Sequence, residues 1–235
     1  PIGYQAVQER PNPDSLNAEQ RLAYYDQIYR VGKQYLEDNK AEYGDIITRP
    51  ADRRENYVKR CVGLPGQTLQ IKNRIVYLDG KPNKEPDNVQ YSYYVKLRQG
   101  LPDDLMKELG ISMEDLTSLN TQGYMPLTKH AVAVLATRKD LVESISLNTD
   151  ATEGDLYPLN ADTHWTRDNY GPIWIPAKGK SIRLTLDNLP VYERPIRAYE
   201  GNDLQVKNGK IYINGRQTDT YTFKMDYYWM MGDNR

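Results

Sequence analysis

The 235-residue sequence is poor in the residues that form disulfides or hold metals. Cys61 is its one cysteine, so no disulfide can form within the chain, and the cysteine count leaves the redox compartment open. The only histidines, His130 and His164, have no cysteine or second histidine at ligand spacing. We therefore expect no zinc site, no Ser/His/Asp triad, and no metal or other cofactor.

Long apolar runs and an excess of one charge are also missing. No run of roughly eighteen apolar residues occurs, so these residues are expected to hold neither a transmembrane helix nor a signal peptide. The formal net charge is -1, which argues against nucleic acid as a partner. Hydrophobic residues make up 39% and charged residues 27%, so the chain can bury a real core.

The most specific pattern lies in residues 56–66, which read as a short strand followed by a turn. Alternation along a strand places Lys59 on one face with Tyr57 and Cys61, while Val58 and Arg60 face the other way. Pro-Gly at residues 65–66 then predicts a type II turn, in which the glycine takes the positive φ.

Lys-Arg-x-x-Gly-x-Pro-Gly at residues 59–66 follows Gly-Asp-Ile-Ile at 44–47 and precedes Gly-Asp-Asn-Arg at 232–235. In this order the three blocks resemble conserved blocks of bacterial type I signal peptidase. Gln67 departs from the family, which commonly has Asp after the turn, and is interpreted as a tolerated substitution. Each motif alone also fits an edge-strand charge or a plain turn, whereas their ordered combination favours the family.

The family's nucleophile block, Ser-Met-x-Pro-Thr, does not occur in the sequence. Ser112 and Met113 are followed by Glu-Asp-Leu instead, and Ser112 is interpreted as a helix N-cap. The resemblance thus implies a fragment that lacks the membrane anchor, the nucleophile block and the C-terminal end. We expect such a fragment to be inactive alone.

The resemblance implies a Ser/Lys dyad in which Lys59 is the general base. A lysine base must be neutral, so Lys59 is expected to be buried near Tyr57, Cys61 and residues 227–231. The predicted supporting residues are Arg60, Gly232, Asp233, Asn234 and Arg235, with Arg60 forming an ion-pair lattice with Asp233 and Arg235. The predicted substrate-binding residues are Asn56, Tyr57 and Val58, which offer a strand edge to the peptide.

The same resemblance implies the partners and the location. The substrates are signal peptides of exported preproteins, cleaved at small-x-small sites. A missing N-terminal anchor would bring the protein to the membrane surface. The expected location is the inner membrane, with the catalytic domain on the periplasmic or extracytoplasmic face.

The predicted fold is mainly antiparallel β, with a signal-peptidase-like β core, an inserted α+β subdomain and an N-terminal helix. The expected segments are an extended lead-in and helix (1–43), the first part of the β core (44–88), the inserted subdomain (89–199) and the second part of the core (200–235). Residues 66–80 match residues 201–215 at seven of fifteen positions, which predicts two similar hairpins.

Hydrophobic periodicity predicts the individual elements. The N-terminal helix is expected from Asp14 or Ser15 to about Lys40. Further helices are expected at about 103–109, at 112–119 and from after Thr128 to about Lys139, strands at 46–48, 89–97 and 141–147, and loops over 158–179. The nearly apolar stretch 221–231 is interpreted as one strand buried on both faces.

Two other functions fit parts of the sequence. A self-cleaving repressor-type domain also uses Ser and Lys, but no DNA-binding segment is present. A non-catalytic extracytoplasmic binding module would explain the twenty tyrosines beside one phenylalanine, because tyrosine suits exposed ligand platforms. That alternative leaves the ordered blocks unexplained.

Overall fold

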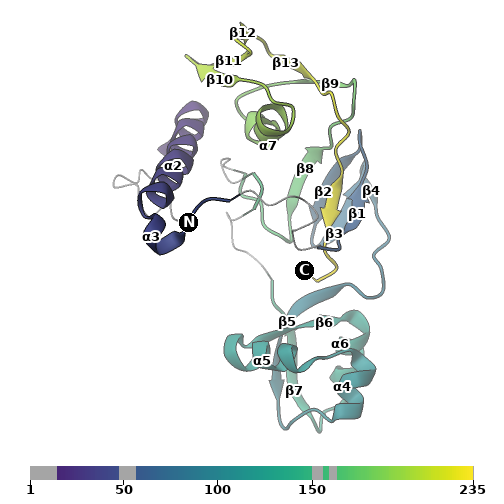
Figure 1. Cartoon of the computed structure of the whole chain (residues 1–235). Helices are drawn as coiled ribbons and strands as arrows, with labels where there is room; N and C mark the ends of the chain where they lie inside the picture. The colour runs from purple at the N-terminus through teal and green to yellow at the C-terminus, as the bar shows by residue number, and fades with distance from the viewer. Residues whose placement is uncertain (1–14, 48–56, 150–155, 159–162, 235) are drawn as a thin grey trace. The chain divides into compact units, whose positions relative to one another are not determined.

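The computed structural model describes residues 15–47, 57–149, 156–158 and 163–234 (Figure 1). They form two compact units. Of the described residues, unit 1 contains 15–47, 57, 156–158, 163–164 and 176–227, and unit 2 contains 58–149, 165–175 and 228–234. Each unit is built from segments far apart in the sequence, and the division into four consecutive segments stays a prediction.

The helices and strands confirm the predicted fold class, because every pairing between the named strands is antiparallel. The helices are α2 (Ala18–Asp38), α3 (Lys40–Tyr43), α4 (Asp103–Leu109), α5 (Met113–Gln122), α6 (Lys129–Thr137), α7 (Leu189–Arg194) and the π-helical turn η3 (Pro195–Tyr199). The strands are β1 (Arg60–Gly63), β2 (Thr68–Lys72), β3 (Ile75–Leu78), β4 (Lys81–Pro82), β5 (Gln90–Leu97), β6 (Tyr124–Thr128), β7 (Val142–Leu147), β8 (Tyr170–Trp174), β9 (Ser181–Arg183), β10 (Leu204–Lys207), β11 (Lys210–Ile213), β12 (Arg216–Gln217), β13 (Thr220–Thr222) and β14 (Trp229–Met231). None of the described helices is both long and apolar enough to cross a bilayer.

Helix α2 belongs to unit 1 and begins later than predicted. Its N-cap is Asn17, whose side chain accepts a hydrogen bond from the backbone N–H of Gln20, while the Gln20 side chain accepts one from the backbone N–H of Asn17. This reciprocal pair satisfies two backbone groups, which makes Asn17 a better cap than Ser15. Asp14, the other expected cap, lies outside the described residues.

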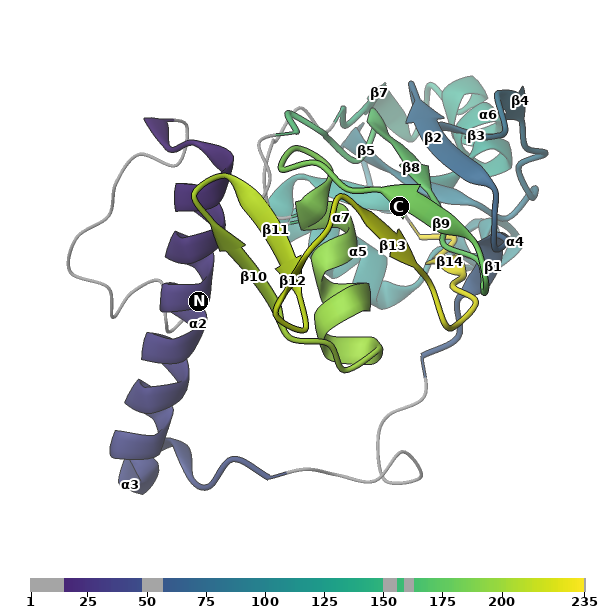
Figure 2. The same cartoon turned by 90° about the horizontal axis from the view of Figure 1, so that it is seen from above.

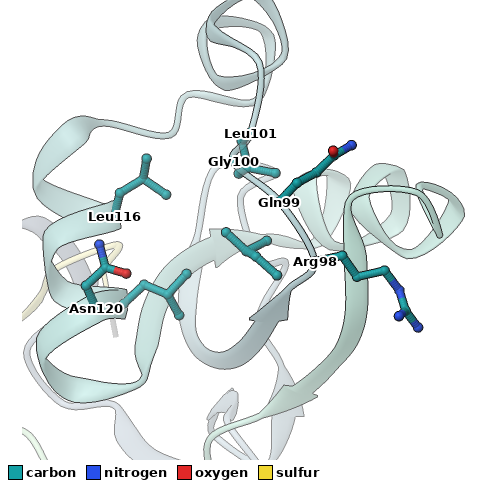
Figure 3. Close-up of a pocket in the computed structure, with 8 residues that line it drawn as sticks. Arg98, Gln99, Gly100, Leu101, Leu116 and Asn120 are labelled. Atoms are coloured by element: carbon teal, nitrogen blue, oxygen red, sulfur yellow. The ribbon is translucent and has the colours of Figure 1, made fainter.

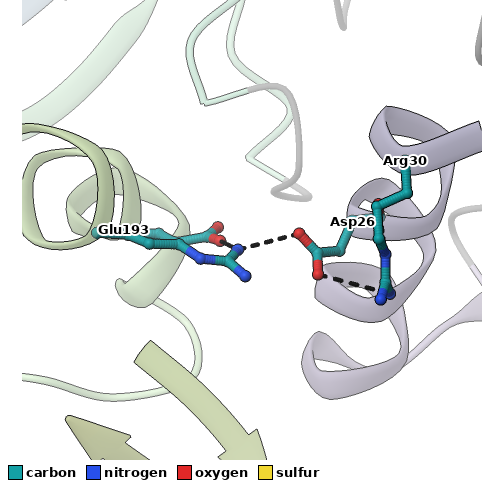
Figure 4. A network of polar contacts seen from close by, with 4 residues as sticks. Asp26, Arg30 and Glu193 are labelled. Atoms are coloured by element: carbon teal, nitrogen blue, oxygen red, sulfur yellow. Dashed lines mark hydrogen bonds and ion pairs between the residues drawn. The ribbon is translucent and has the colours of Figure 1, made fainter. Parts of the chain in front are cut away.

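A charged network ties α2 to α7 and η3 within unit 1 (Figure 4). Nη1 of Arg197 lies 3.0 Å from a carboxylate oxygen of Asp26 on α2 and 3.0 Å from one of Glu193 on α7. The hydrogen bond to Asp26 raises the pKa of Arg197 above its ordinary value. The helix is therefore held by a contact that its apolar periodicity did not predict.

The inserted α+β part, residues 90–147 of the wider insertion expected at 89–199, lies in unit 2 and has its own core, whereas residues 176–199 of that insertion lie in unit 1. Strand β5 forms the centre of the sheet β6-β5-β7. Side chains of helices α4, α5 and α6 complete the hydrophobic core that packs with this sheet. Its most deeply buried side chains are Met125, Leu127, Ala131 and Leu135. Ser112 caps α5 as predicted, α6 begins after Thr128 as predicted with that threonine as its cap, and β6 is a strand that the sequence did not predict.

The two similar hairpins are confirmed, and the likeness extends to a third strand. Strands β2, β3 and β4 pair as one antiparallel three-stranded repeat. Strands β10, β11 and β12 form a second repeat with the same register, 135 positions later. The second turn of each is closed in the same way. The Asp79 side chain accepts from the Thr68 backbone at 2.8 Å, and the Asn214 side chain accepts from the Asp203 backbone at 2.9 Å.

Three expected elements are wrong. Ile46 and Ile47 are exposed and form no strand, and the third residue of that expected strand lies outside the described residues. The expected loop 158–179 contains β8, which pairs with β2. The stretch 221–231 is not one buried strand, because it divides into β13 and β14 with exposed residues between them, and Met230 within β14 is 52% exposed.

Candidate active site

Strands β1 and β14 bring two of the motif blocks together within unit 2. Arg60 pairs with Met231 and Cys61 with Met230, and the register shifts before Gly63 pairs with Trp229. The pairing places the residues before β1 next to the residues after β14. Lys59 and Gly232 therefore meet at the same end of this ladder, which brings the two blocks into one site.

Gly63 permits this close packing. A Cβ atom at Gly63 would lie 2.4 Å from Cδ1 of Ile175 and 3.2 Å from Cβ of Trp229. The ring of Trp229 also packs on that of Tyr170, with centroids 5.4 Å apart. A side chain at position 63 would therefore have to displace the end of the Ile175 side chain and shift Trp229 of β14 by a few tenths of an ångström.

Lys59 lies immediately before β1, and its side chain runs along Gly232. A Cβ atom at Gly232 would lie 3.4 Å from Cδ and 3.6 Å from Cε of Lys59. The glycine thus leaves room for the aliphatic part of the lysine. The expected burial of Lys59 is wrong for this chain, since the residue is exposed, as are Tyr57 and Cys61. The strand begins only at Arg60, which leaves residues 57–59 outside the sheet.

Arg60 and Asp233 form the expected ion pair. Nε of Arg60 donates to Oδ1 of Asp233 at 2.7 Å, and both side chains are about one third exposed. Arg235, the other expected member of the lattice, lies outside the described residues. The pair fixes the start of β1 to the residues that follow β14.

Gln90, the first residue of β5, also pairs with the C-terminal motif block, a contact that was not predicted from the sequence. The backbone N–H of Gln90 donates to the carbonyl of Asp233 at 2.7 Å, and Gln90 forms a parallel bridge with Asn234. Backbone pairing leaves no residue-type signal, so no motif could have identified Gln90. The inserted part is consequently joined to the candidate site by main-chain contacts.

The turn after β1 has the predicted backbone. Gly66 has a φ of 87°, and the backbone N–H of Gln67 donates to the carbonyl of Leu64 at 3.1 Å. The side chain of Gln67 accepts from the Leu64 backbone at 2.8 Å, so its carbonyl oxygen closes the turn. Trp174 of β8 donates from Nε1 to the carbonyl of Gly66 at 3.0 Å, a contact not predicted from the sequence.

Of the three expected substrate-binding residues, two are described. Tyr57 is 75% exposed and Val58 is 92% exposed. Asn56 lies outside the described residues. An exposed, extended segment before a strand can accept a peptide, but it does not by itself show that it does.

The described part of the chain offers no metal site but contains a pocket away from the motif blocks. No group of three or more His, Cys, Asp or Glu side chains there is placed to hold a metal. A shallow pocket of about 290 Å³ lies in the inserted α+β part (Figure 3). It is lined on one side by Leu116 and Asn120 of α5, while the side chain of Arg98 extends away from it (Figure 3). None of its lining residues belongs to the motif blocks.

Comparison with known proteins bears on the motif blocks. The profile of the family described as "Signal peptidase, peptidase S26" matches residues 9–140. "Signal peptidase I" of Bacillus caldolyticus is 50% identical over 42 residues, which cover 18% of this chain and 23% of that protein. "Signal peptidase IB" of Staphylococcus aureus strain Mu50 is 36% identical over 59 residues, which cover 25% of this chain and 29% of that protein. These alignments span less than a third of either relative, and no solved structure matches the chain.

Proposed function

Because this chain belongs to the signal peptidase family, peptidase S26, we propose that the whole protein is a serine endopeptidase that removes signal peptides from exported preproteins. The observation that carries the proposal is the contact of Lys59 with Gly232, which lies beside the Arg60–Asp233 ion pair. Two of the three blocks that carry the family resemblance thus meet at one lysine. The expected cleavage sites have small residues at the first and third positions before the bond.

In the proposed reaction a serine hydroxyl attacks the scissile carbonyl, and the neutral amine of Lys59 takes the hydroxyl proton as general base. The resulting ammonium then gives that proton to the leaving amine, and water hydrolyses the acyl-enzyme. The serine belongs to a Ser-Met-x-Pro-Thr block, which these 235 residues do not contain. We therefore propose that this chain by itself is inactive.

Lys59 must lose water before it can act as a base, because burial disfavours the charged form of an amine. Since Lys59 is exposed in this chain, we assign that desolvation to the bound substrate. A peptide paired with Asn56, Tyr57 and Val58 would cover the lysine as it binds. Arg60, Gly232, Asp233, Asn234 and Arg235 would support the site, with the Arg60–Asp233 pair fixing β1 to β14.

The proposed location follows from the proposed substrates. Exported preproteins are processed at the inner membrane, so we place the whole protein there, with the catalytic domain on the periplasmic or extracytoplasmic face. An anchor outside these residues would hold it at the membrane surface.

The proposal is tested by incubating the whole, membrane-reconstituted protein with a preprotein whose signal peptide ends in Ala-x-Ala. The expected product begins at the residue after the second alanine, as read by N-terminal sequencing. A matched preprotein with Lys at both alanine positions serves as the control and is expected to stay uncut. Cleavage of both substrates at other bonds, or of neither, would contradict the proposed function.

A further inference from the structure

The two three-stranded repeats differ at one edge. In unit 2 the sheet order is β4-β3-β2-β8, so the outer edge of β2 is covered by an antiparallel strand. In unit 1 the order is β10-β11-β12, and no strand in the described part of the chain pairs with the outer edge of β10 (Figure 2). The second repeat therefore has the same three strands as the first but, among the described residues, no equivalent of β8.

The outer edge of β10 presents the same backbone N–H and C=O groups that β2 uses to pair with β8. Asp203 exchanges hydrogen bonds with Asn214, so its backbone faces β11. Because antiparallel strands alternate, the backbone groups of Leu204 and Val206 point to the outer edge. The equivalent residues of β2, Leu69 and Ile71, pair there with Ile173 and Tyr170 of β8. A strand could thus pair with β10 as β8 pairs with β2.

The charges at the end of β10 indicate which side chain an added strand should carry. Lys207 lies directly opposite Lys210, and no carboxylate among the described residues forms an ion pair with either. Like charges in opposed positions destabilise a strand pair. Glu19 reaches this turn but accepts from the backbone N–H of Gly209 at 2.7 Å. A carboxylate from outside the hairpin would relieve the repulsion.

Strand β8 shows where such a carboxylate would sit. Asp168, two residues before β8, forms an ion pair with Arg74 in the turn between β2 and β3 at 2.9 Å. Asn169 accepts from the backbone of Asn73 in the same turn at 3.0 Å. An antiparallel strand on β10 would bring its own N-terminal end to the equivalent turn, beside Lys207 and Lys210.

We propose that the outer edge of β10 binds an extended segment of a partner protein by strand addition. The segment carries Asp or Glu at its N-terminal end, followed by aromatic and β-branched residues that lie against Leu204 and Val206. Main-chain hydrogen bonds supply the affinity, and the acidic residue supplies the selectivity. Edge lysines discourage pairing with uncharged strands, which is why the acidic residue is required.

The probe is a fluorescent peptide with the sequence of residues 168–175, Asp-Asn-Tyr-Gly-Pro-Ile-Trp-Ile, titrated with the 235-residue chain. Saturable binding in fluorescence anisotropy is expected. Val206→Pro removes an outward N–H and should weaken binding at least about five-fold. This factor corresponds to the free energy of about one hydrogen bond. Lys207→Glu should weaken it about two- to five-fold, the range of an exposed ion pair.

The repeat provides a matched control, Lys72→Glu, which changes the equivalent lysine beside an edge that β8 already covers. This variant should bind the peptide as the unchanged chain does, and a probe with Asn in place of its Asp should bind less tightly. Circular dichroism checks that each variant is folded. The proposal is overturned by absence of saturable binding up to about 1 mM, by equal weakening in Lys72→Glu and Lys207→Glu, or by Val206→Pro acting only on self-association of the chain.

Discussion

Arg60 and Asp233 are 173 positions apart, yet Nε of the arginine lies 2.7 Å from Oδ1 of the aspartate. This ion pair joins the residue that opens β1 to the second residue after β14. Together with the β1–β14 pairing and the main-chain contacts of Gln90, it therefore helps to hold Lys59 beside Gly232. A change that weakens the Arg60–Asp233 ion pair should therefore also alter the position of Lys59.

We predict that Asp233→Asn destabilises the chain by about 1 kcal/mol, the upper range for a partly exposed ion pair. The loss arises because Arg60 keeps its charge without its carboxylate. Urea unfolding measures the difference, and hydrogen exchange should show faster exchange in β14. Asp219→Asn is the control, since Asp219 lies 3.8 Å from Arg183 with both side chains largely exposed. Equal destabilisation by both changes would argue against a special role for Asp233.

Gly63→Ala tests the close approach of β1 and β14. The added methyl group would overlap Cδ1 of Ile175 at 2.4 Å, so we expect a loss of about 1–3 kcal/mol, typical of overpacking. Thermal unfolding measures it. Gly100→Ala is the matched control, because nothing lies within 4 Å of a Cβ atom there and the backbone φ is not positive. If both variants unfold at the same temperature, the packing at Gly63 is looser than described.

Glu200 anchors the segment that leads toward β14, within unit 1. Its carboxylate accepts from the backbone of Lys224 at 2.9 Å, from the backbone of Met225 at 3.2 Å and from the hydroxyl of Tyr221 at 2.5 Å. Glu200→Gln is expected to cost about 1–3 kcal/mol at neutral pH, because three charge-assisted hydrogen bonds, one of them from the part-buried hydroxyl of Tyr221, lose the carboxylate charge. Urea unfolding of Glu143→Gln, which loses only an exposed partner of Lys96, should change far less.

Loss of the hydroxyl proton of Tyr221 is expected to lower the stability of the fold at alkaline pH. Burial, and then its hydrogen bond to Glu200, raise the pKa of Tyr221 from 10.0 to about 12. The folded state therefore holds the hydroxyl proton more tightly, so this contribution to stability is complete below pH 10 and is lost as the pH rises toward about 12. Unfolding free energies measured across this range should fall less steeply for Tyr221→Phe. An identical slope in both proteins would contradict the assignment.

Much of the fold could be predicted because its signals are local. The helix cap at Ser112, the start of a helix after Thr128, and the hairpins at 66–80 and 201–215 depend on residues close in sequence. The misses have longer-range causes. Strand β8 contains Gly171 and Pro172, which suggest a loop until the edge of β2 is known to need a partner. Exposed residues between β13 and β14 likewise interrupt what looked like one apolar strand.

The candidate site was predicted by its residue types and not by its geometry. The motif blocks identified Lys59, Arg60 and Asp233, and the structure places them together. The expected burial of Lys59 failed because a run of strand-forming residues does not fix where the strand begins. The contact from Gln90 was not predictable, since it uses only the main chain.

The most direct test of the account concerns the amine of Lys59. In the whole protein, Lys59→Ala should reduce cleavage of an Ala-x-Ala preprotein by at least about a hundred-fold, the usual contribution of a general base. Lys81→Ala, at an exposed lysine of β4, should leave the rate unchanged. Circular dichroism should show both variants folded. Cleavage by folded Lys59→Ala at the rate of the unchanged protein would contradict the role of Lys59 as the base.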